Sequence, residues 1–453
     1  MHSSEIPCLQ GLPLIANLAD IRYRRLDFLL RLSREYGPIS AFRVGSQTCL
    51  LINTPELVYE VLAVHAFDFE KPALIRSYLY PLLGNGLVLS ENAFHRQQRK
   101  LIAPIFMRNR LSAYADIIGS YTERFHSRWA EDETLDIAHQ MMRLTLWIIG
   151  QILFKADVLY EAEELDMALM RTQRHVSSLF GSLFPIPYTW PTPSNLRFRK
   201  DLTHLDAIIY RLLEQRHQSS KNDSDLLSIL LKAQEEDGNY MSDSQVRDEA
   251  ITLFLAGHEN MSNALTWTWY LLLQHPHVYR RMRDEVDNNL GGRIATFADL
   301  PNLPYTLQVF KEAMRLYPPA YIIGRQAVRP VKIGKYQLPT GAIVLISAYT
   351  LHRRSDYFPD PERFDPERFA PEAEQCLPPH AYIPFGMGPR SCIGGHLAMI
   401  EGQIILATLA QRVLFQRMDR RDAEPEALIS LRPKNGINVL VRHRPELHSI
   451  LES

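Results

Sequence analysis

Apolar residues recur at two different spacings along this chain of 453 residues, and the two spacings predict different elements. Between Leu26 and Leu32 they follow the repeat of an amphipathic helix. Two runs of strand character come next, at 39–44 and 48–52, and Gly45-Ser46 between them predicts a hairpin turn. From about residue 95 to 290 the helical repeat dominates, which indicates a mostly helical body.

Two segments interrupt this helical part and predict loops: a proline-rich, apolar stretch at 184–193 and a polar run at 219–225. Ser242, followed three residues later by Gln245, is a capping-box signal that predicts a helix running to about Gln274. Polar residues occur inside its apolar turns, so we expect something polar against its middle. These residues are Thr252, His258, Glu259, Asn260 and Ser262.

The last third of the chain has a different pattern. A strand-like run occupies 342–346, a proline-rich coil covers 358–369, and a helical stretch follows Gly395. The expected fold class is therefore mainly α with a smaller β-rich part.

Composition excludes several classes of protein. Hydrophobic residues make up 46% and charged residues 22% of the chain, which excludes disordered, collagen-like and disulfide-scaffold proteins. Fifty basic against 51 acidic residues give a net charge of -1, so nothing indicates nucleic acid as a partner. Four distant cysteines predict neither a disulfide framework nor a zinc site.

The chain shows no signal-peptide pattern and no apolar stretch of ~20 residues. We therefore expect a cytoplasmic protein without a transmembrane anchor. We further expect one domain over residues 1–453, acting as a monomer.

The segment from Phe385 to Gly395 places one cysteine, Cys392, among glycines just before a predicted helix. Glycines let the backbone bend close to the sulfur, while backbone N–H groups, the positive end of the helix and Arg390 favour a thiolate. A single thiolate without a second soft ligand suits the axial position of a haem iron better than zinc or an iron–sulfur cluster. The alternative interpretation is a buried structural cysteine in a tight turn.

The spacing of this segment favours the first interpretation. Phe-x-x-Gly-x-Arg-x-Cys-x-Gly is matched at all five fixed positions, by Phe385, Gly388, Arg390, Cys392 and Gly394. This pattern resembles the haem-binding loop of the cytochrome P450 family. The resemblance implies the cytochrome P450 fold, haem b as cofactor with Cys392 as the axial ligand of its iron, and Phe385 and Arg390 among the cofactor-binding residues.

Further motifs follow in the family's order, so that the resemblance covers about residues 30 to 440. Glu312 and Arg315 lie three apart on one face of a predicted helix, where they can pair. In the family the matching residues join a later arginine, here Arg368, in a buried network that holds the cysteine loop. Arg363, in the first copy of a tandem Pro-Glu-Arg-Phe, is the alternative that we do not expect to take part. We interpret the network as architectural, because a half-broken buried pair is strongly destabilising.

The long helix carries the family's oxygen-binding motif, in which Gly257 would bring the backbone close to a flat cofactor and Glu259 would place a carboxylate near the bound oxygen. The alternative is that Glu259 only caps or solvates a kink. Family members most often have a proton-delivering threonine after the acid, whereas this chain has Asn260. An amide is a poor proton donor at neutral pH, so proton delivery would depend on water, on Glu259 or on a substrate hydroxyl. Glu259 and Asn260 are the expected catalytic residues.

The family resemblance also implies cationic partners for the haem propionates. His95 and Arg99 lie four apart on one helix face, and Arg325 and Arg390 complete the set. Each of these side chains, taken alone, is typical of a solvated surface charge.

Substrate and electron supply are less defined. The segments that would line the pocket are dominated by aliphatic and aromatic residues, which fits an apolar small molecule such as a terpenoid, fatty-acyl chain, polyketide or steroid, and equally an ordinary core. These segments are 73–88, 179–190, the middle of the long helix, and 320–323. A biosynthetic role in secondary metabolism is typical of such family members.

No nucleotide fingerprint of a fused reductase is apparent. Two electrons from NAD(P)H would then arrive through a separate ferredoxin or flavodoxin. The partner would bind to the basic residues near Arg96, Arg99, Lys100, Arg108 and Arg110.

The expected reaction is therefore the insertion of one oxygen atom from O2 into the substrate, as hydroxylation or epoxidation. Two alternatives keep the fold. One is a peroxide-driven or oxygen-independent enzyme, such as an isomerase or dehydratase, which Asn260 would permit. The other is a non-catalytic haem-binding sensor.

Overall fold

The computed structural model describes residues 6–9, 17–45, 47–154, 159–180, 186–218, 226–232, 241–419 and 421–444. The predicted loop at 219–225 and part of the one at 184–193 lie outside them. The α-helices are α1 (Leu18–Tyr23), α2 (Arg25–Glu35), α3 (Pro55–Tyr59), α4 (Ala73–Leu83), α5 (Asn92–Ile102), α6 (Arg108–His126), α7 (Ile137–Phe154), α8 (Leu159–Phe180), α9 (Pro193–Gln218), α10 (Leu226–Lys232), α11 (Asp243–Gln274), α12 (Pro276–Leu290), α13 (Pro304–Leu316), α14 (Ala348–Leu351), α15 (Pro371–Gln375) and α16 (Gly395–Arg412).

The strands are shorter and lie mainly near the two ends of the chain. They are β1 (Ile39–Val44), β2 (Gln47–Ile52), β3 (Phe69–Glu70), β4 (Thr134–Asp136), β5 (Ile323–Ala327), β6 (Val331–Ile333), β7 (Tyr336–Leu338), β8 (Ile343–Ile346), β9 (Val413–Arg417), β10 (Pro425–Ala427), β11 (Leu431–Pro433) and β12 (Asn438–His443). The expected fold class, mainly α with a smaller β-rich part, is confirmed.

The largest sheet joins the predicted hairpin to strands from much later in the chain, in the order β1-β2-β8-β5-β3. β1 and β2 pair antiparallel from Ile39 opposite Ile52 to Val44 opposite Gln47, as the sequence predicts. Gly45 has φ +60°, a left-handed conformation that glycine adopts without strain. β2 then pairs in parallel with β8, which confirms the strand predicted at 342–346.

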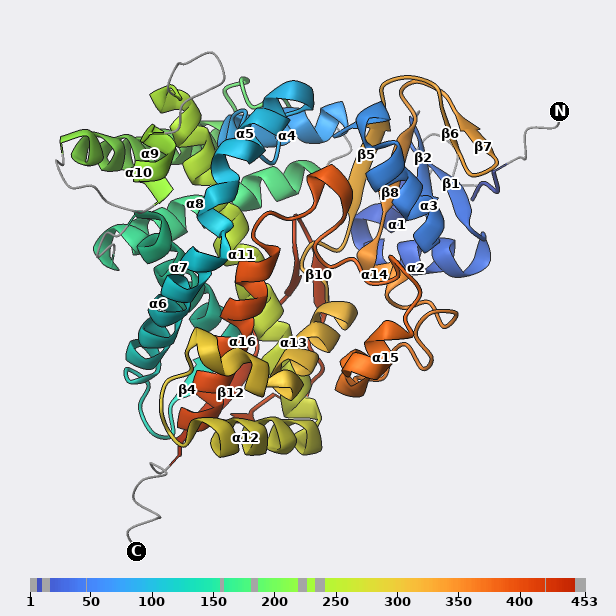
Figure 1. The fold of residues 1–453 in the computed structure, drawn as a ribbon. Coiled ribbons are helices and arrows are strands. Elements are labelled where there is room, and N and C mark those ends of the chain that lie inside the picture. The colour runs from blue at the N-terminus through green and yellow to red at the C-terminus, as the bar shows by residue number, and fades with distance from the viewer. Residues whose placement is uncertain are drawn as a thin grey trace, which may run out of the picture.

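α11 is the central helix, and its beginning is the one predicted. The hydroxyl of Ser242 accepts a hydrogen bond from the backbone N–H of Gln245, at 3.3 Å, and so caps the first turn. Along its length α11 packs against α7, α9, α13 and α16. Figure 1 shows α11 between the helices of one side of the molecule and the sheet of β1, β2, β5 and β8 on the other.

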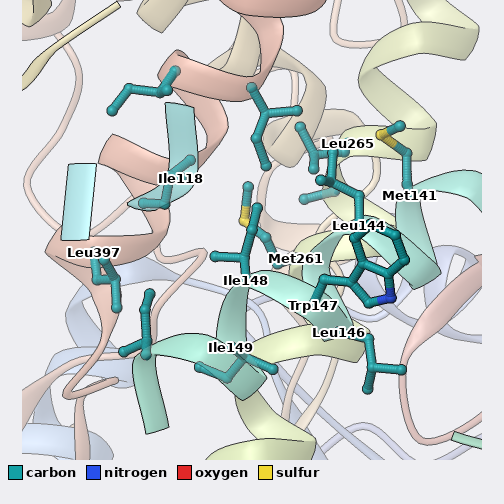
Figure 2. Packing of buried hydrophobic residues seen from close by; sticks show 14 of the residues in the cluster. Ile118, Met141, Leu144, Leu146, Trp147, Ile148, Ile149, Met261, Leu265 and Leu397 are labelled. Carbon is teal, nitrogen blue, oxygen red and sulfur yellow. The ribbon is translucent and has the colours of Figure 1, made fainter. Parts of the chain in front are cut away.

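The main hydrophobic core surrounds α11 and α7. Figure 2 shows Met261 and Leu265 of α11 against Leu144 and Ile148 of α7, all of them buried. Smaller cores lie between the large sheet and the helices near it. In the part of the chain that the structure describes, no helix combines the length and apolar character needed to cross a membrane.

Candidate haem-thiolate site

The cysteine loop runs from Phe385 to α16 and is shaped by its glycines. Gly388 has φ +69°, and a Cβ there would lie 2.0 Å from the backbone oxygen of Leu62, so only glycine fits. The backbone N–H of Cys392 donates to the oxygen of Phe385, at 2.9 Å, which closes the loop. The Phe385 ring packs against the main core and lies 3.4 Å from the position of a Cβ on Gly395.

Arg99, on α5, lies far from this loop in the sequence and holds it through two hydrogen bonds. Its Nη1 donates to the backbone oxygen of Ser391 at 2.8 Å, and its Nη2 donates to the Ser391 hydroxyl at 3.4 Å. The Cys392 side chain is accessible, yet the surrounding protein desolvates the sulfur and raises the pKa of the thiol. A hydrogen bond from the N–H of Gly394 and the charge of Arg99 act in the opposite direction and lower this pKa.

The expectation that Arg390 supplies the charge beside the sulfur was therefore wrong. Arg99 is the cation whose charge lowers the pKa of the Cys392 thiol, and Arg390 pairs instead with Glu91. The backbone N–H contribution that the sequence predicts is present.

A buried ion network lies behind the loop. Arg315 donates through Nε and Nη2 to both oxygens of Glu312, at 2.6 and 2.8 Å, and neither side chain is exposed. Arg368 lies 3.5 Å from Glu312, whereas the Arg363 side chain is 69% exposed. The side chain of Arg368, which the family resemblance favoured, is therefore part of this network, and that of Arg363 is not. We call Glu312, Arg315 and Arg368 the Glu312 network.

His352 connects the Glu312 network to the approach of the cysteine loop. Arg315 Nη1 donates to the backbone oxygen of His352 at 2.8 Å, and the N–H of Ile383 donates to His352 Nε2 at 2.9 Å. Complete burial, followed by the charge of Arg315, lowers the pKa of His352 to about 3. The ring stays neutral, which is the state that can accept the Ile383 hydrogen bond.

The middle of α11 combines an accessible face with a packed one. Ala256 is exposed, while a Cβ on Gly257 would lie 2.8 Å from the Ile149 side chain of α7, which Figure 2 labels. The missing side chain of Gly257 allows α7 to pack against α11, while its approach to a cofactor stays a prediction. Ala256 is the small residue on the accessible face.

The two expected catalytic residues on α11 make different contacts. Asn260 Nδ2 donates to the backbone oxygen of Ala256 at 3.4 Å, one turn back along its own helix. Glu259 accepts at Oε2 from Gln173 Nε2 of α8, at 2.7 Å, and at Oε1 from the Ser430 hydroxyl, at 2.5 Å. Burial raises the pKa of Glu259, and these hydrogen bonds and the charge of Arg432 partly offset the shift.

Arg390 pairs with an acid, Glu91, at the start of α5, and two further cations, Lys71 and Arg325, lie close by. Arg390 Nη2 pairs with Glu91 Oε2, and the backbone N–H of Lys71 donates to Glu91 Oε1 at 2.9 Å. Burial and the charges of Arg390 and Arg325 hold the pKa of Lys71 well below its ordinary value. Burial also lowers the pKa of Arg325 and of Arg390 to about 10. We call Lys71, Arg325 and Arg390 the cation cluster.

His95 lies beside this cluster and is buried. Desolvation first, and then the charges of Lys71, Arg99 and Arg325, lower its pKa to about 4. As it stands, His95 is therefore a neutral hydrogen-bonding group and not the cation that the sequence suggested. A carboxylate placed against it would raise this pKa.

These residues fit a haem. Within the described residues, the buried Nη1 of Arg390 has no hydrogen-bond partner, and the cation cluster carries more positive charge than Glu91 balances. Two propionate carboxylates would supply the missing acceptors and charge. An accessible single cysteine held by a glycine-rich loop has the donor chemistry of an axial thiolate.

Four residues of the site escaped the sequence analysis: Lys71, Glu91, His352 and Ser430. None belongs to a local pattern, and each meets its partner across a long stretch of chain. Tyr321, in a segment expected to line the substrate, is buried and donates its hydroxyl to Leu428 at 3.0 Å instead. Lys71, Glu91, His352 and Ser430 could have been found in advance only by comparing many related sequences.

Comparison with known proteins agrees with this site. The family model described as "Cytochrome P450" matches residues 6–441. The chain is 35% identical to cyclooctatin synthase of Streptomyces melanosporofaciens, over 93% of this chain and 92% of that protein. It is 30% identical to pentalenene oxygenase of Streptomyces avermitilis, over 93% of each. The crystal structure of the cytochrome P450DA heme domain has the same fold, with a TM-score of 0.90, 24% identity, and coverage of 98% of this chain and 99% of that one.

Proposed function

The chain belongs to the cytochrome P450 family and is a monooxygenase of that family, and on this premise we propose that it inserts one oxygen atom from O2 into an apolar small molecule. The accessible thiol of Cys392 on its glycine loop is the observation that carries this proposal. When haem is bound, it supplies the oxygen chemistry, with a thiolate ligand that favours O–O cleavage.

Cys392 would hold the iron, and the residues around it would set its properties. The N–H of Gly394 and the charge of Arg99 favour the thiolate form of the sulfur. Lys71, Arg325, Arg390 and neutral His95 would bind the propionates, which adds Lys71 to the expected set.

Asn260 and Glu259 are the polar groups in the middle of α11. The Asn260 amide can donate or accept a hydrogen bond and can orient water, but it does not release a proton at neutral pH. Both oxygens of Glu259 already accept hydrogen bonds from protein donors. Each oxygen keeps a second lone pair, so a proton could pass through Glu259 only if a further donor reached one of these oxygens.

The named relatives support an apolar, terpenoid-like substrate. The two relatives described above are named after cyclooctatin and pentalenene. A further relative, 33% identical over 89% of this chain and 87% of that protein, is cyclooctat-9-en-7-ol 5-monooxygenase of Streptomyces melanosporofaciens. We propose a small apolar terpenoid as the substrate class, a role in secondary metabolism, and electrons from NAD(P)H through a separate ferredoxin or flavodoxin. Arg96, Lys100 and Arg108 are exposed and could bind an acidic partner, whereas Arg99 is held by Ser391.

The first experiment is the reduced, carbon-monoxide-bound difference spectrum of the purified protein. A band near about 450 nm is expected for wild type, and its loss is expected for Cys392→Ala. Cys376→Ala is the matched control, because Cys376 is an exposed cysteine on α15's C-terminal side. A wild-type protein without this band would overturn the proposal.

A second candidate, peroxide-driven turnover, is favoured by one observation: Asn260 stands where a proton-donating hydroxyl is usual in the family. A panel of pentalenene, cyclooctat-9-en-7-ol and related terpenoids, tested with NADPH and redox proteins or with hydrogen peroxide alone, separates the two. Product formed only with peroxide would exclude the O2-dependent reaction.

A further inference from the structure

One face of α11 binds a single turn of the C-terminal hairpin through three residues spaced four apart. Glu259, Asn263 and Trp267 lie above one another on the helix. Asn263 Nδ2 donates to the Ser430 hydroxyl at 2.9 Å, and Trp267 Nε1 donates to the backbone oxygen of Leu431 at 3.1 Å. With the Ser430 bond to Glu259, these contacts fix the start of β11 against the middle of α11.

The directions of these hydrogen bonds are set by chemistry. The Ser430 hydroxyl has one proton and accepts from Asn263, so its proton is left for the carboxyl of Glu259. The second oxygen of Glu259 accepts from Gln173 on α8. One carboxyl group therefore joins α8, α11 and the turn between β10 and β11.

The turn held in this way lies beside the accessible part of α11. Leu428 and Ile429 are half-buried, and the side chain of Ile429 packs against the main core. At about 100° per residue, Ala256 lies about 60° around the helix from Glu259 and about 20° from Asn263, and Asn260 lies about 100° and about 60° from them, so both residues are next to the face that binds the turn. A shift of the turn would change the wall next to these two residues.

We propose that Glu259 is a positioning residue and not a proton donor: with Ser430 and Gln173 it fixes the Leu428–Ser430 turn, and thereby determines which part of the substrate is presented for oxidation. This inference rests on the proposed function for its link to substrate. The positioning of the turn itself does not depend on that function.

The decisive comparison is between two substitutions of one residue. In Glu259→Gln the new amide can still accept from Ser430 and can donate to the amide oxygen of Gln173 after that side chain rotates. Glu259→Ala and Ser430→Ala each remove the hydrogen bond between Ser430 and Glu259, whereas Ser430→Thr keeps a hydroxyl that can form it. Ser262→Ala is the matched control, because the proton of this buried hydroxyl can go to the Glu259 backbone oxygen or to Met142 Sδ, and neither bond reaches the turn.

The first readout is amide hydrogen exchange of the peptide over residues 425–433. We expect exchange about tenfold faster in Glu259→Ala and Ser430→Ala, which lose hydrogen bonds to a charged or buried group. Glu259→Gln, Ser430→Thr and Ser262→Ala should remain within about twofold of wild type. Equal exchange in Ser430→Ala and Ser262→Ala would overturn the positioning role.

The second readout uses 4-phenylimidazole and imidazole as probes of the pocket, followed by the shift of the Soret band. The ratio of their affinities should change by about tenfold in Glu259→Ala and Ser430→Ala and return in Ser430→Thr. In O2-dependent turnover, the rate of product formation by Glu259→Gln should be similar to that of Ser430→Thr and higher than that of Glu259→Ala. If Glu259→Gln instead ranked with Glu259→Ala in O2-dependent turnover alone, Glu259 would be a proton donor and the inference would be wrong.

The carbon-monoxide spectrum of each variant separates this inference from the proposed function. A wild-type protein lacking the thiolate band would overturn the function, while the exchange experiment would still test the turn.

Discussion

The Glu312 network and the cation cluster are both buried groups of charges, but they differ in how fully the protein satisfies their central arginines. Arg368, at the edge of the Glu312 network, contacts Glu312 at 3.5 Å, and its Nε makes no hydrogen bond within the described residues. Arg315 has five N–H donors, and all five have acceptors: both oxygens of Glu312 and the backbone oxygens of His352, Pro361 and Arg363. In the cation cluster, Arg390 Nη1 has no partner among the described residues. Mutual repulsion and burial hold the pKa of Lys71 well below its ordinary value.

This difference separates structural charges from charges that bind a ligand. A closed network can only lose stability when one member is removed, because the remaining charge is buried without a partner. A cluster with excess positive charge costs stability by itself and recovers it when anions bind. The following predictions test this distinction, beginning with the largest expected effect.

Breaking the Glu312 network should lower the free energy of unfolding by about 3–5 kcal/mol, because Arg315→Leu removes the two hydrogen bonds of the buried Glu312 to Arg315 and leaves Arg368, at 3.5 Å, as its remaining cation. Thermal and denaturant unfolding measure this loss, together with the yield of folded protein. Arg363→Ala is the control, since its exposed side chain lies 4.0 Å from Asp365 and should change stability by less than about 0.5 kcal/mol. Similar losses in both variants would contradict the architectural role of the network.

Removing a member of the cation cluster should weaken haem binding more than folding. Arg325→Leu is expected to speed haem transfer to an acceptor protein by about tenfold, because one charge-assisted hydrogen bond to a propionate is lost. The haem-free protein should become no less stable, since burial already lowers the pKa of Arg325 to about 10. Arg329→Leu, an exposed arginine paired with Asp68, is the control. Unchanged haem transfer together with a large loss of stability would place Arg325 with the structural charges.

Glu249 provides a third case, a buried carboxyl that forms no ion pair with any of the described residues. Desolvation, with a contribution from Asp248, raises its pKa to about 8, while the N–H of Leu87 donates to its Oε2 at 2.9 Å. The folded protein therefore binds this proton more tightly than the unfolded chain. Its stabilising contribution is complete below pH 4.5 and is lost as the pH rises to about 8.

The measurement is the free energy of unfolding across this pH range in wild type and in Glu249→Gln. In the variant, the free energy of unfolding should decline less steeply with pH, by up to about 1.4 kcal/mol per pH unit. Identical slopes would show that Glu249 does not hold its proton in the folded state. Glu424→Gln is the control, because the exposed Glu424 pairs with Lys434.

Asn260→Thr should have the smallest effect on stability, within about 0.5 kcal/mol, because an uncharged polar residue with one long hydrogen bond is replaced. The thiolate spectrum should be unchanged, while the ratio of product to NADPH consumed should change, since a hydroxyl can donate a proton where an amide does not. A constant ratio would mean that Asn260 has no part in proton delivery.

The sequence alone predicted the features whose interactions are local. The cap at Ser242 and the hairpin of β1 and β2 depend on residues within a few positions of one another, and both were confirmed. The spacing around Cys392 identified the family for the same reason, because a glycine-rich loop specifies its own backbone path. The choice of Arg368 over Arg363 came from the family resemblance, and the structure agrees with it.

Only the tertiary structure decided which distant groups meet. Arg390 pairs with Glu91, 299 residues away in sequence, and Ser430 binds Glu259 across 171 residues. No local pattern marks Lys71, Glu91, His352 or Ser430, and none shows that Gly257 lies against Ile149 of α7. Hydrogen-bond partners and desolvation depend on what the fold places around a group, so the same side chain can be a solvated charge, part of a closed network or a ligand for an anion.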